Sequence, residues 1–158
     1  MKQRVLGNGQ KVSAIGLGCM GMDHAYGKPA DRQDMIRLIH RALENGCNFF
    51  DTAVIYGKGN EEVLGNALSS MREKAVIATK FGITGQVVKN GKLENLLDSS
   101  PQSIRVQLEG SLSRLKTDYI DLYYQHRVDP NVEPEVVAST MKDLMAEGKI
   151  KGWGLSNA

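Results

Sequence analysis

The chain has 158 residues, of which 41% are hydrophobic and 24% are charged, as is ordinary for one globular domain with its own core. No apolar run approaches the roughly 18 residues that a membrane-spanning helix needs, and the first residues lack the apolar stretch of a secretory signal. The net charge is +2, from 20 basic and 18 acidic residues that are well mixed. This balance gives little support for a nucleic-acid surface. Membrane and nucleic-acid partners are therefore not expected.

The two cysteines, Cys19 and Cys47, are too few and too far apart for a disulfide scaffold or a metal site. We expect no metal, and two reduced, buried thiols in a cytoplasmic protein.

Short alternating segments at residues 2–14 surround an Asn-Gly turn signal at Asn8, which predicts an N-terminal hairpin. Apolar, strand-like segments then alternate with amphipathic, helix-like ones. Capping residues or prolines mark the helix starts at Asp31, Asn60, Ser100-Pro101 and Pro134. Residues 82–99 are rich in Gly, Asn and Ser and predict a long loop. The strands are expected at residues 14–19, 47–50, 75–79, 119–125 and 150–155.

The alternation of strands and helices predicts an α/β fold with a parallel sheet and right-handed crossovers. Two architectures fit: an open doubly wound sheet, or part of a (β/α)8 barrel, which typically takes about 250 residues. Five strands and four helices build only about half of such a barrel. We therefore expect a curved parallel sheet in chain order, with the helices on its outer face. Large residues such as Phe49, Ile77 and Leu122 are expected on the uncovered inner face.

Gly16, Gly18 and Gly21 match the G-x-G-x-x-G pattern of dinucleotide-binding loops, and Asp51 ends the next predicted strand. That motif works only when a helix begins at the loop and directs its N-terminus at the pyrophosphate. Here residues 22–29 come before any helix, and Asp51 follows Gly21 by 30 residues instead of roughly 20. We therefore reject a Rossmann-type site.

Three predicted strands end on an ionisable residue: Asp51, Lys80 and His126. The carboxyl ends of parallel strands lie on one face, where α/β enzymes build their sites, and Tyr56 follows Asp51 closely enough to lie there too. A lysine beside a tyrosine favours the phenolate, a carboxylate orients the lysine, and such a tyrosine can protonate a developing alkoxide. Each residue also has a simpler interpretation: a loop cap, a packing tyrosine, a solvated lysine or a core histidine. Four together favour a site.

Five segments give the chain a family resemblance: residues 17–22, 50–57, 77–82, 118–126 and 154–157. Through them the sequence resembles the aldo-keto reductases, which are TIM-type (β/α)8 barrels preceded by a hairpin. The resemblance covers the N-terminal half of that family. It implies that residues 1–158 are the N-terminal half of such a barrel, with a hairpin, five strands and four helices. Residues 125–130 look most like the bacterial and plant branch that reduces aldehydes and ketones.

The resemblance implies hydride transfer from NADPH to the carbonyl carbon of an aldehyde or ketone. It implies that Tyr56 protonates the carbonyl oxygen, that Lys80, held by Asp51, tunes Tyr56, and that His126 orients the carbonyl and stabilises negative charge. The residues implied near the nicotinamide and its ribose are Cys19, Met20, Asp51, Ser156 and Asn157.

The family is about twice as long as this chain, and the resemblance implies that its other half supplies most of the phosphate-binding groups. We therefore expect weak or absent NADPH binding and no turnover by the chain alone, with self-association or pairing with a C-terminal half. The stop at Ala158, just after a predicted strand, resembles a truncation. Two other hypotheses remain: an inactive half-barrel that serves as an interaction or assembly module, and another barrel enzyme that acts on a phosphorylated substrate.

Overall fold

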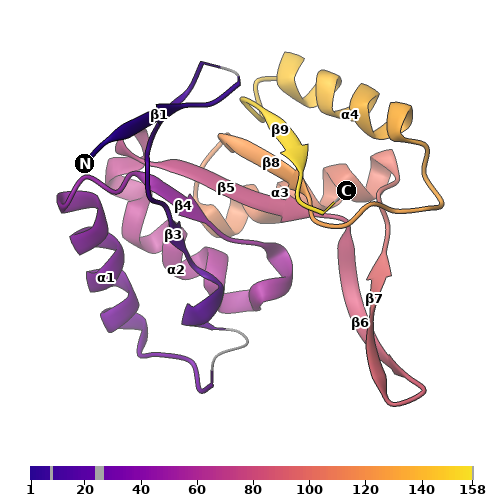
Figure 1. The fold of residues 1–158 in the computed structure, drawn as a ribbon, viewed down its shortest axis with the longest axis horizontal. Helices are drawn as coiled ribbons and strands as arrows, with labels where there is room; N and C mark the ends of the chain where they lie inside the picture. Colours follow the sequence, from indigo (N-terminus) through magenta and orange to yellow (C-terminus); the bar gives the residue numbers. More distant parts are fainter. Residues whose placement is uncertain (8, 24–26, 158) are drawn as a thin grey trace.

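The computed structural model describes residues 1–7, 9–23 and 27–157 (Figure 1). The chain begins with an antiparallel hairpin of β1 (Gln3–Val5) and β2 (Lys11–Ser13), in which Gln3 lies opposite Ser13. The predicted N-terminal hairpin is therefore confirmed, although Asn8 of its turn signal lies outside the described residues. No helix in the described part of the chain is both long and apolar enough to cross a bilayer.

The central sheet has five strands in the order β3-β4-β5-β8-β9, and every neighbouring pair is parallel. Strand order follows chain order because each crossover returns through a helix on the same side of the sheet. Several strands begin later than their apolar runs do, and ahead of the last two strands Ile120 and Ile150 form an isolated parallel bridge. The strands are β3 (Leu17–Gly18), β4 (Phe49–Asp51), β5 (Val76–Phe81), β8 (Leu122–Gln125) and β9 (Trp153–Leu155).

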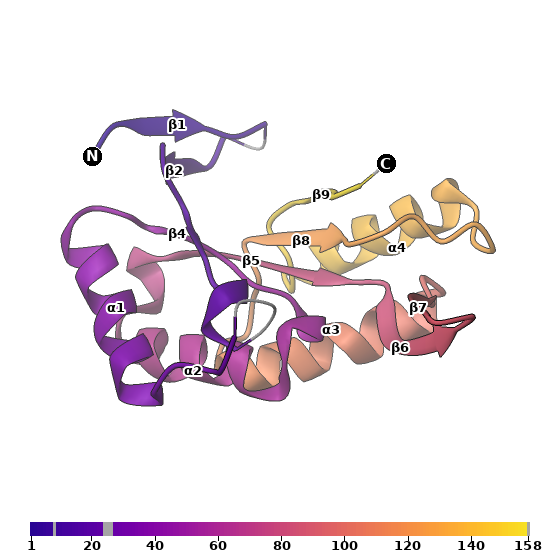
Figure 2. The same ribbon diagram turned by 60° about the horizontal axis from the view of Figure 1, so that its bottom comes forward.

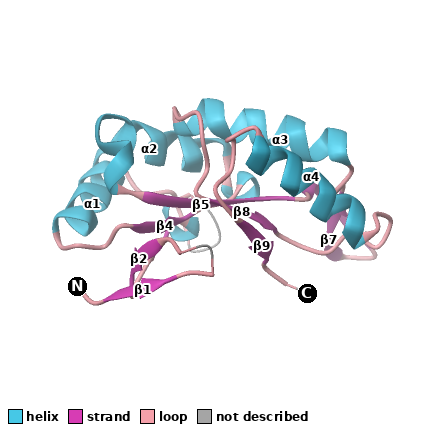
Figure 3. Ribbon diagram, turned by 90° about the horizontal axis from the view of Figure 1, so that it is seen from above, coloured by secondary structure: helices cyan, strands magenta, loops and turns pink. Residues whose placement is uncertain are grey.

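Four α-helices cover one face of the sheet, as Figure 3 shows. Asp31 and Ser100 cap α1 and α3 as predicted, since each side chain accepts from backbone N–H groups of the first turn. The predicted cap at Asn60 is wrong: the second helix begins at Lys58, after Gly57 at φ +121°, and Asn60 lies inside its first turn. The helices are α1 (Arg32–Glu44), α2 (Lys58–Leu68), α3 (Pro101–Leu115) and α4 (Pro134–Ala146), and three 3-10 turns are η1 (Met20–Met22), η2 (Val54–Tyr56) and η3 (Ser69–Lys74).

The hydrophobic core lies between the sheet and these helices. Phe50 and Ile77 are register partners, both fully buried, and belong to this core. The expectation that Ile77 lies on the inner face is therefore wrong. Phe49 precedes Phe50 and so points to the opposite, inner face. Leu122 lines a hollow of about 480 Å³ between the inner face and the N-terminal hairpin.

Residues 82–99 form a hairpin instead of the predicted loop. β6 (Ile83–Lys89) and β7 (Lys92–Leu97) pair antiparallel and project from the body of the molecule (Figures 1 and 2). The turn is Asn90-Gly91, at φ +51° and +73°, and Asn-Gly is the sequence typical of a tight hairpin turn. The Asn-Gly pair therefore indicates a hairpin in the sequence itself, whereas the Gly, Asn and Ser content of the segment, taken alone, predicts a loop.

Candidate active site

A buried lysine ammonium lies at the carboxyl end of the sheet, where β4 and β5 end side by side. Lys80 Nζ donates to Asp51 Oδ1 at 2.5 Å, to the backbone oxygen of Thr52 at 2.8 Å and to the phenol oxygen of Tyr56 at 3.3 Å. The Lys80 side chain is 7% exposed, whereas that of Asp51 is 38% exposed. An ammonium group has three N–H donors, so each donor of Lys80 has one acceptor, and the position of Nζ is well determined.

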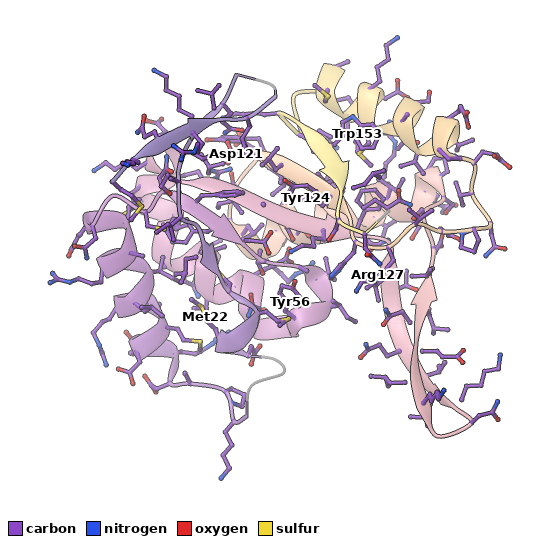
Figure 4. The ribbon with its side chains drawn as sticks, viewed as in Figure 1. Met22, Tyr56, Asp121, Tyr124, Arg127 and Trp153 are labelled. Atoms are coloured by element: carbon purple, nitrogen blue, oxygen red, sulfur yellow. The ribbon has the colours of Figure 1, made fainter. Side chains whose placement is uncertain are left out.

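Tyr56 reaches this group from η2, the 3-10 turn that follows β4. Its ring meets that of His126, which follows β8, edge to face, with ring centroids 5.8 Å apart and planes at 87°. The backbone N–H of His126 donates to the backbone oxygen of Phe81 at 2.9 Å, which keeps His126 beside the end of β5. The structure thus brings Asp51, Tyr56, Lys80 and His126 together at one end of the sheet, and Figure 4 labels Tyr56 there.

The His126 imidazole is neutral near pH 7. Its pKa is lowered from 6.5 to about 4, first by burial and then by the positive charges of Lys80 and Arg127. A neutral imidazole has one N–H donor and one acceptor nitrogen. His126 can therefore donate a hydrogen bond to a ligand without being an acid that competes with the phenol.

The residues expected near a nicotinamide lie in two places. Cys19 is fully buried, its N–H donates to the backbone oxygen of Asp51 at 2.8 Å, and burial raises the pKa of its thiol to about 12. Its side chain is thus inside the protein. Met20 follows in η1 and is half-buried, whereas Ser156 and Asn157 are exposed. The Ser156 N–H donates to the backbone oxygen of Gln125, so both residues lie at the same end of the sheet as His126.

In the described part of the chain, no three His, Cys, Asp or Glu side chains lie close enough to hold a metal ion.

Sequence reasoning missed two kinds of neighbour. Tyr124 pairs in register with Lys80 and with Gly154, and its ring lies across Gly154, where a Cβ would come within 2.9 Å of Tyr124 Cε1. Burial, followed by the Asp51 charge, raises the pKa of Tyr124 above 10. The backbone oxygen of Thr52 accepts from Lys80, and the Thr52 hydroxyl donates to Asn60. The register of β5 with β8 indicates that Tyr124 lies beside Lys80. No local sequence pattern indicates that Asn60 lies near the site.

The aldo/keto reductase family model matches residues 14–158, nearly all of the chain. The chain belongs to the aldo/keto reductase family. A Glycine max relative named "Probable aldo-keto reductase 1" is 47% identical over 152 residues, which are 95% of this chain and 43% of that protein. This family membership agrees with the resemblance found in the sequence.

Solved aldo-keto reductases show the same fold. One from Bacillus halodurans, in its holo form, superposes with a TM-score of 0.86 at 34% identity, over 99% of this chain and 50% of that one. One from Klebsiella pneumoniae in complex with NADPH gives 0.77 at 31% identity, over 98% of this chain and 50% of that one. This aldo/keto reductase chain therefore spans about half the length of the relatives it matches, and its parallel sheet and helices form part of a TIM-type (β/α) barrel.

Proposed function

We propose that this chain carries the proton-transfer half of an NADPH-dependent carbonyl reductase that acts on aldehydes or ketones. The observation that supports this most directly is the Lys80 ammonium, which lies within hydrogen-bond distance of both the Asp51 carboxylate and the Tyr56 phenol oxygen. When bound, NADPH supplies the hydride that attacks the carbonyl carbon. Tyr56 supplies the proton that the carbonyl oxygen needs.

Tyr56 acts as the general acid in this proposal. Its oxygen accepts a hydrogen bond from Lys80 Nζ at 3.3 Å, and its own O–H donates to the carbonyl oxygen of the substrate. As that proton leaves, negative charge builds on the phenol oxygen. Lys80 is buried, where the effective dielectric is low, so its charge stabilises the developing phenolate more than it would in water.

His126 orients the carbonyl in this mechanism. Because the pKa of His126 is about 4, its ring is neutral at pH 7 and donates one N–H to the carbonyl oxygen, which lies between it and Tyr56. Two donors on one oxygen fix its position and stabilise the charge that develops on it.

The described residues fit the nicotinamide end of the cofactor. The Asp51 carboxylate is still 38% exposed although it pairs with Lys80, so it can also accept from a ribose hydroxyl. Ser156 and Asn157 present an exposed hydroxyl and an exposed amide at the same end of the sheet, groups suited to a carboxamide. We propose that Cys19 and Met20 contribute through their backbone, and that NADPH binds this chain weakly or not at all by itself.

The proposed activity is tested by comparing a completed barrel with the chain alone. The completed barrel is a chimera of this chain with the C-terminal half of the Glycine max relative, which is 47% identical to it over the shared region. NADPH consumption is followed with a panel of aldehydes and ketones. The completed barrel should oxidise NADPH, and the chain alone should not. A completed barrel that binds NADPH but reduces no carbonyl contradicts the proposed activity.

A second function, an assembly module, is supported by the surface of the inner face. The hollow there is lined by apolar residues that include Leu6, Leu122, Trp153 and Leu155, and the last two are 36% and 49% exposed. Such a face favours self-association or pairing with a C-terminal half. In the completed barrel, quenching of Trp153 emission by NADPH supports the reductase, whereas absence of quenching supports the assembly module. We place either function in the cytoplasm, where the free thiols of Cys19 and Cys47 stay reduced.

A further inference from the structure

One buried amide joins the segments that carry the candidate active site. Asn60 Oδ1 accepts from the hydroxyl of Thr52 at 2.6 Å, and Asn60 Nδ2 donates to the backbone oxygen of Cys19 at 2.9 Å. The backbone N–H of Asn60 donates to the oxygen of Gly57, the residue after Tyr56. Asn60 is 2% exposed, and Thr52 and Cys19 are fully buried. Only a side chain with both a donor and an acceptor satisfies both partners.

Thr52, whose hydroxyl donates to Asn60, also provides a backbone acceptor for Lys80. The backbone oxygen of Thr52 accepts from Lys80 Nζ at 2.8 Å, and the Thr52 N–H donates to Ala78 at 2.9 Å. The remaining two donors of Lys80 go to Asp51 and Tyr56. If the Thr52 carbonyl turns away, one donor of the ammonium loses its acceptor, and Nζ is no longer directed at the phenol oxygen.

The strand that carries Lys80 is anchored separately. Thr79, the residue before Lys80, donates its hydroxyl to Glu61 Oε1 at 2.6 Å, and Arg114 Nε pairs with Glu61 Oε2 at 2.7 Å. Two successive residues of α2 therefore hold the two threonines that neighbour the ion pair. A change at Thr52 or Asn60 leaves the bond between Glu61 and β5 in place. Such a change therefore affects the acceptors of the Lys80 ammonium and not the strand that carries Lys80.

We infer that Asn60 is a positioning residue: through the Thr52 hydroxyl it fixes the backbone oxygen that, together with Asp51, directs the Lys80 ammonium at Tyr56. This inference rests on the proposed function for its catalytic consequence, but the geometry that it describes can be measured without turnover. Asn60 makes no hydrogen bond to Lys80 itself, and it acts on the ammonium through Thr52.

The test compares Thr52→Val, which removes the hydroxyl while keeping the shape, with Thr52→Ser, which keeps the hydroxyl. In the ¹⁵N-labelled chain, proton exchange of the Lys80 ammonium is measured by NMR, with its signal assigned by Lys80→Met. Thr52→Val should speed this exchange roughly threefold to tenfold, the equivalent of one hydrogen bond, and Thr52→Ser should restore it. In the completed barrel, kcat should fall by a similar factor while the KM values for NADPH and aldehyde stay unchanged.

Thr140→Val is the matched control, because it removes another buried hydroxyl, bonded within α4 to the backbone oxygen of Val136. It should leave both measurements unchanged. Unchanged Lys80 exchange in Thr52→Val overturns the inference, as does an equal effect of Thr140→Val. A completed barrel without activity, with Lys80 exchange that still responds, contradicts the proposed function and leaves the positioning role standing. The unsubstituted chain gives a check that needs no folded variant: Lys80 protons that exchange as fast as those of exposed Lys2 also overturn the inference.

Discussion

The ring of His126 meets the ring of Tyr56 edge to face, with centroids 5.8 Å apart and planes at 87°. The Lys80 ammonium lies 3.3 Å from the same phenol oxygen. Tyr56 therefore lies between a cation that stabilises its deprotonated form and a neutral imidazole that can share a substrate oxygen with it.

Tyr56→Phe removes the proposed general acid while keeping the ring that packs against His126. In the completed barrel, turnover should fall on the order of 10²–10⁴, which is the usual contribution of general acid catalysis. Steady-state NADPH consumption measures this. Tyr119→Phe is the control, because Tyr119 lies between Arg72 and Lys151 in a separate cluster. If Tyr56→Phe retains normal turnover, the role assigned to Tyr56 is wrong.

Lys80→Met replaces the ammonium by an apolar side chain of similar length. We expect kcat for carbonyl reduction to fall about 10²–10³-fold, because a preorganised charge next to the reacting group is lost. The pH profile of the reverse reaction, alcohol oxidation, should move to higher pH, since it needs the phenolate. Lys149→Met, which removes a surface ion pair with Glu109, should change neither. An unshifted profile in Lys80→Met would show that Lys80 does not act on the phenol.

His126 should make the folded chain less stable in acid. Its pKa is about 4 when folded, against an ordinary value of 6.5, so between these values the unfolded state binds the proton more strongly. Stability therefore rises with pH across this window, and about 2 kcal/mol should be lost on going from about pH 7 to about pH 5. Urea unfolding at the two pH values measures this. His126→Gln should remove that share of the slope, and a variant with the full slope would exclude His126 as its source.

Gly65 marks the close approach of α2 to α3. A Cβ at Gly65 would lie 2.5 Å from the backbone oxygen of Arg114 and 2.7 Å from the backbone of Leu115. Gly65→Ala should cost about 1–3 kcal/mol of unfolding free energy, because two helices must move apart. At Gly110 the nearest atoms to a Cβ belong to the guanidinium of Arg114, at 2.9 Å, and not to a helix backbone. Because a side-chain end can shift further than a helix, Gly110→Ala should cost less than Gly65→Ala. Equal effects in urea unfolding would contradict this packing argument.

The chain alone should self-associate at micromolar concentration. β3 and β9 are the edge strands of the sheet, and Leu155 on β9 is 49% exposed, which favours pairing with another chain. Light scattering should show more than a monomer. Leu155→Glu should weaken the association, whereas Val106→Glu, at an exposed position of α3, should not. A chain that stays monomeric would exclude this use of the edge.

Local patterns were sufficient where local physics decides the structure. Asp31 and Ser100 start helices because their side chains satisfy N–H groups within the next turn. Alternating strands and helices imply a parallel sheet, and a parallel sheet places the ends of its strands on one face. The proximity of Asp51, Lys80 and His126 was therefore predictable from their positions at three strand ends.

The sequence by itself determined the order of the strands and helices of the central sheet, their parallel arrangement and the end of the sheet at which polar residues gather. Only the tertiary structure decided which face each buried residue takes and which distant groups bond. Ile77 packs against the helices. Because its strand is buried on both sides, the hydrophobicity of its residues does not show which face each of them takes. Asn60 lies inside α2, and its side chain bonds Thr52 and Cys19, which belong to segments that only the folded sheet brings to it.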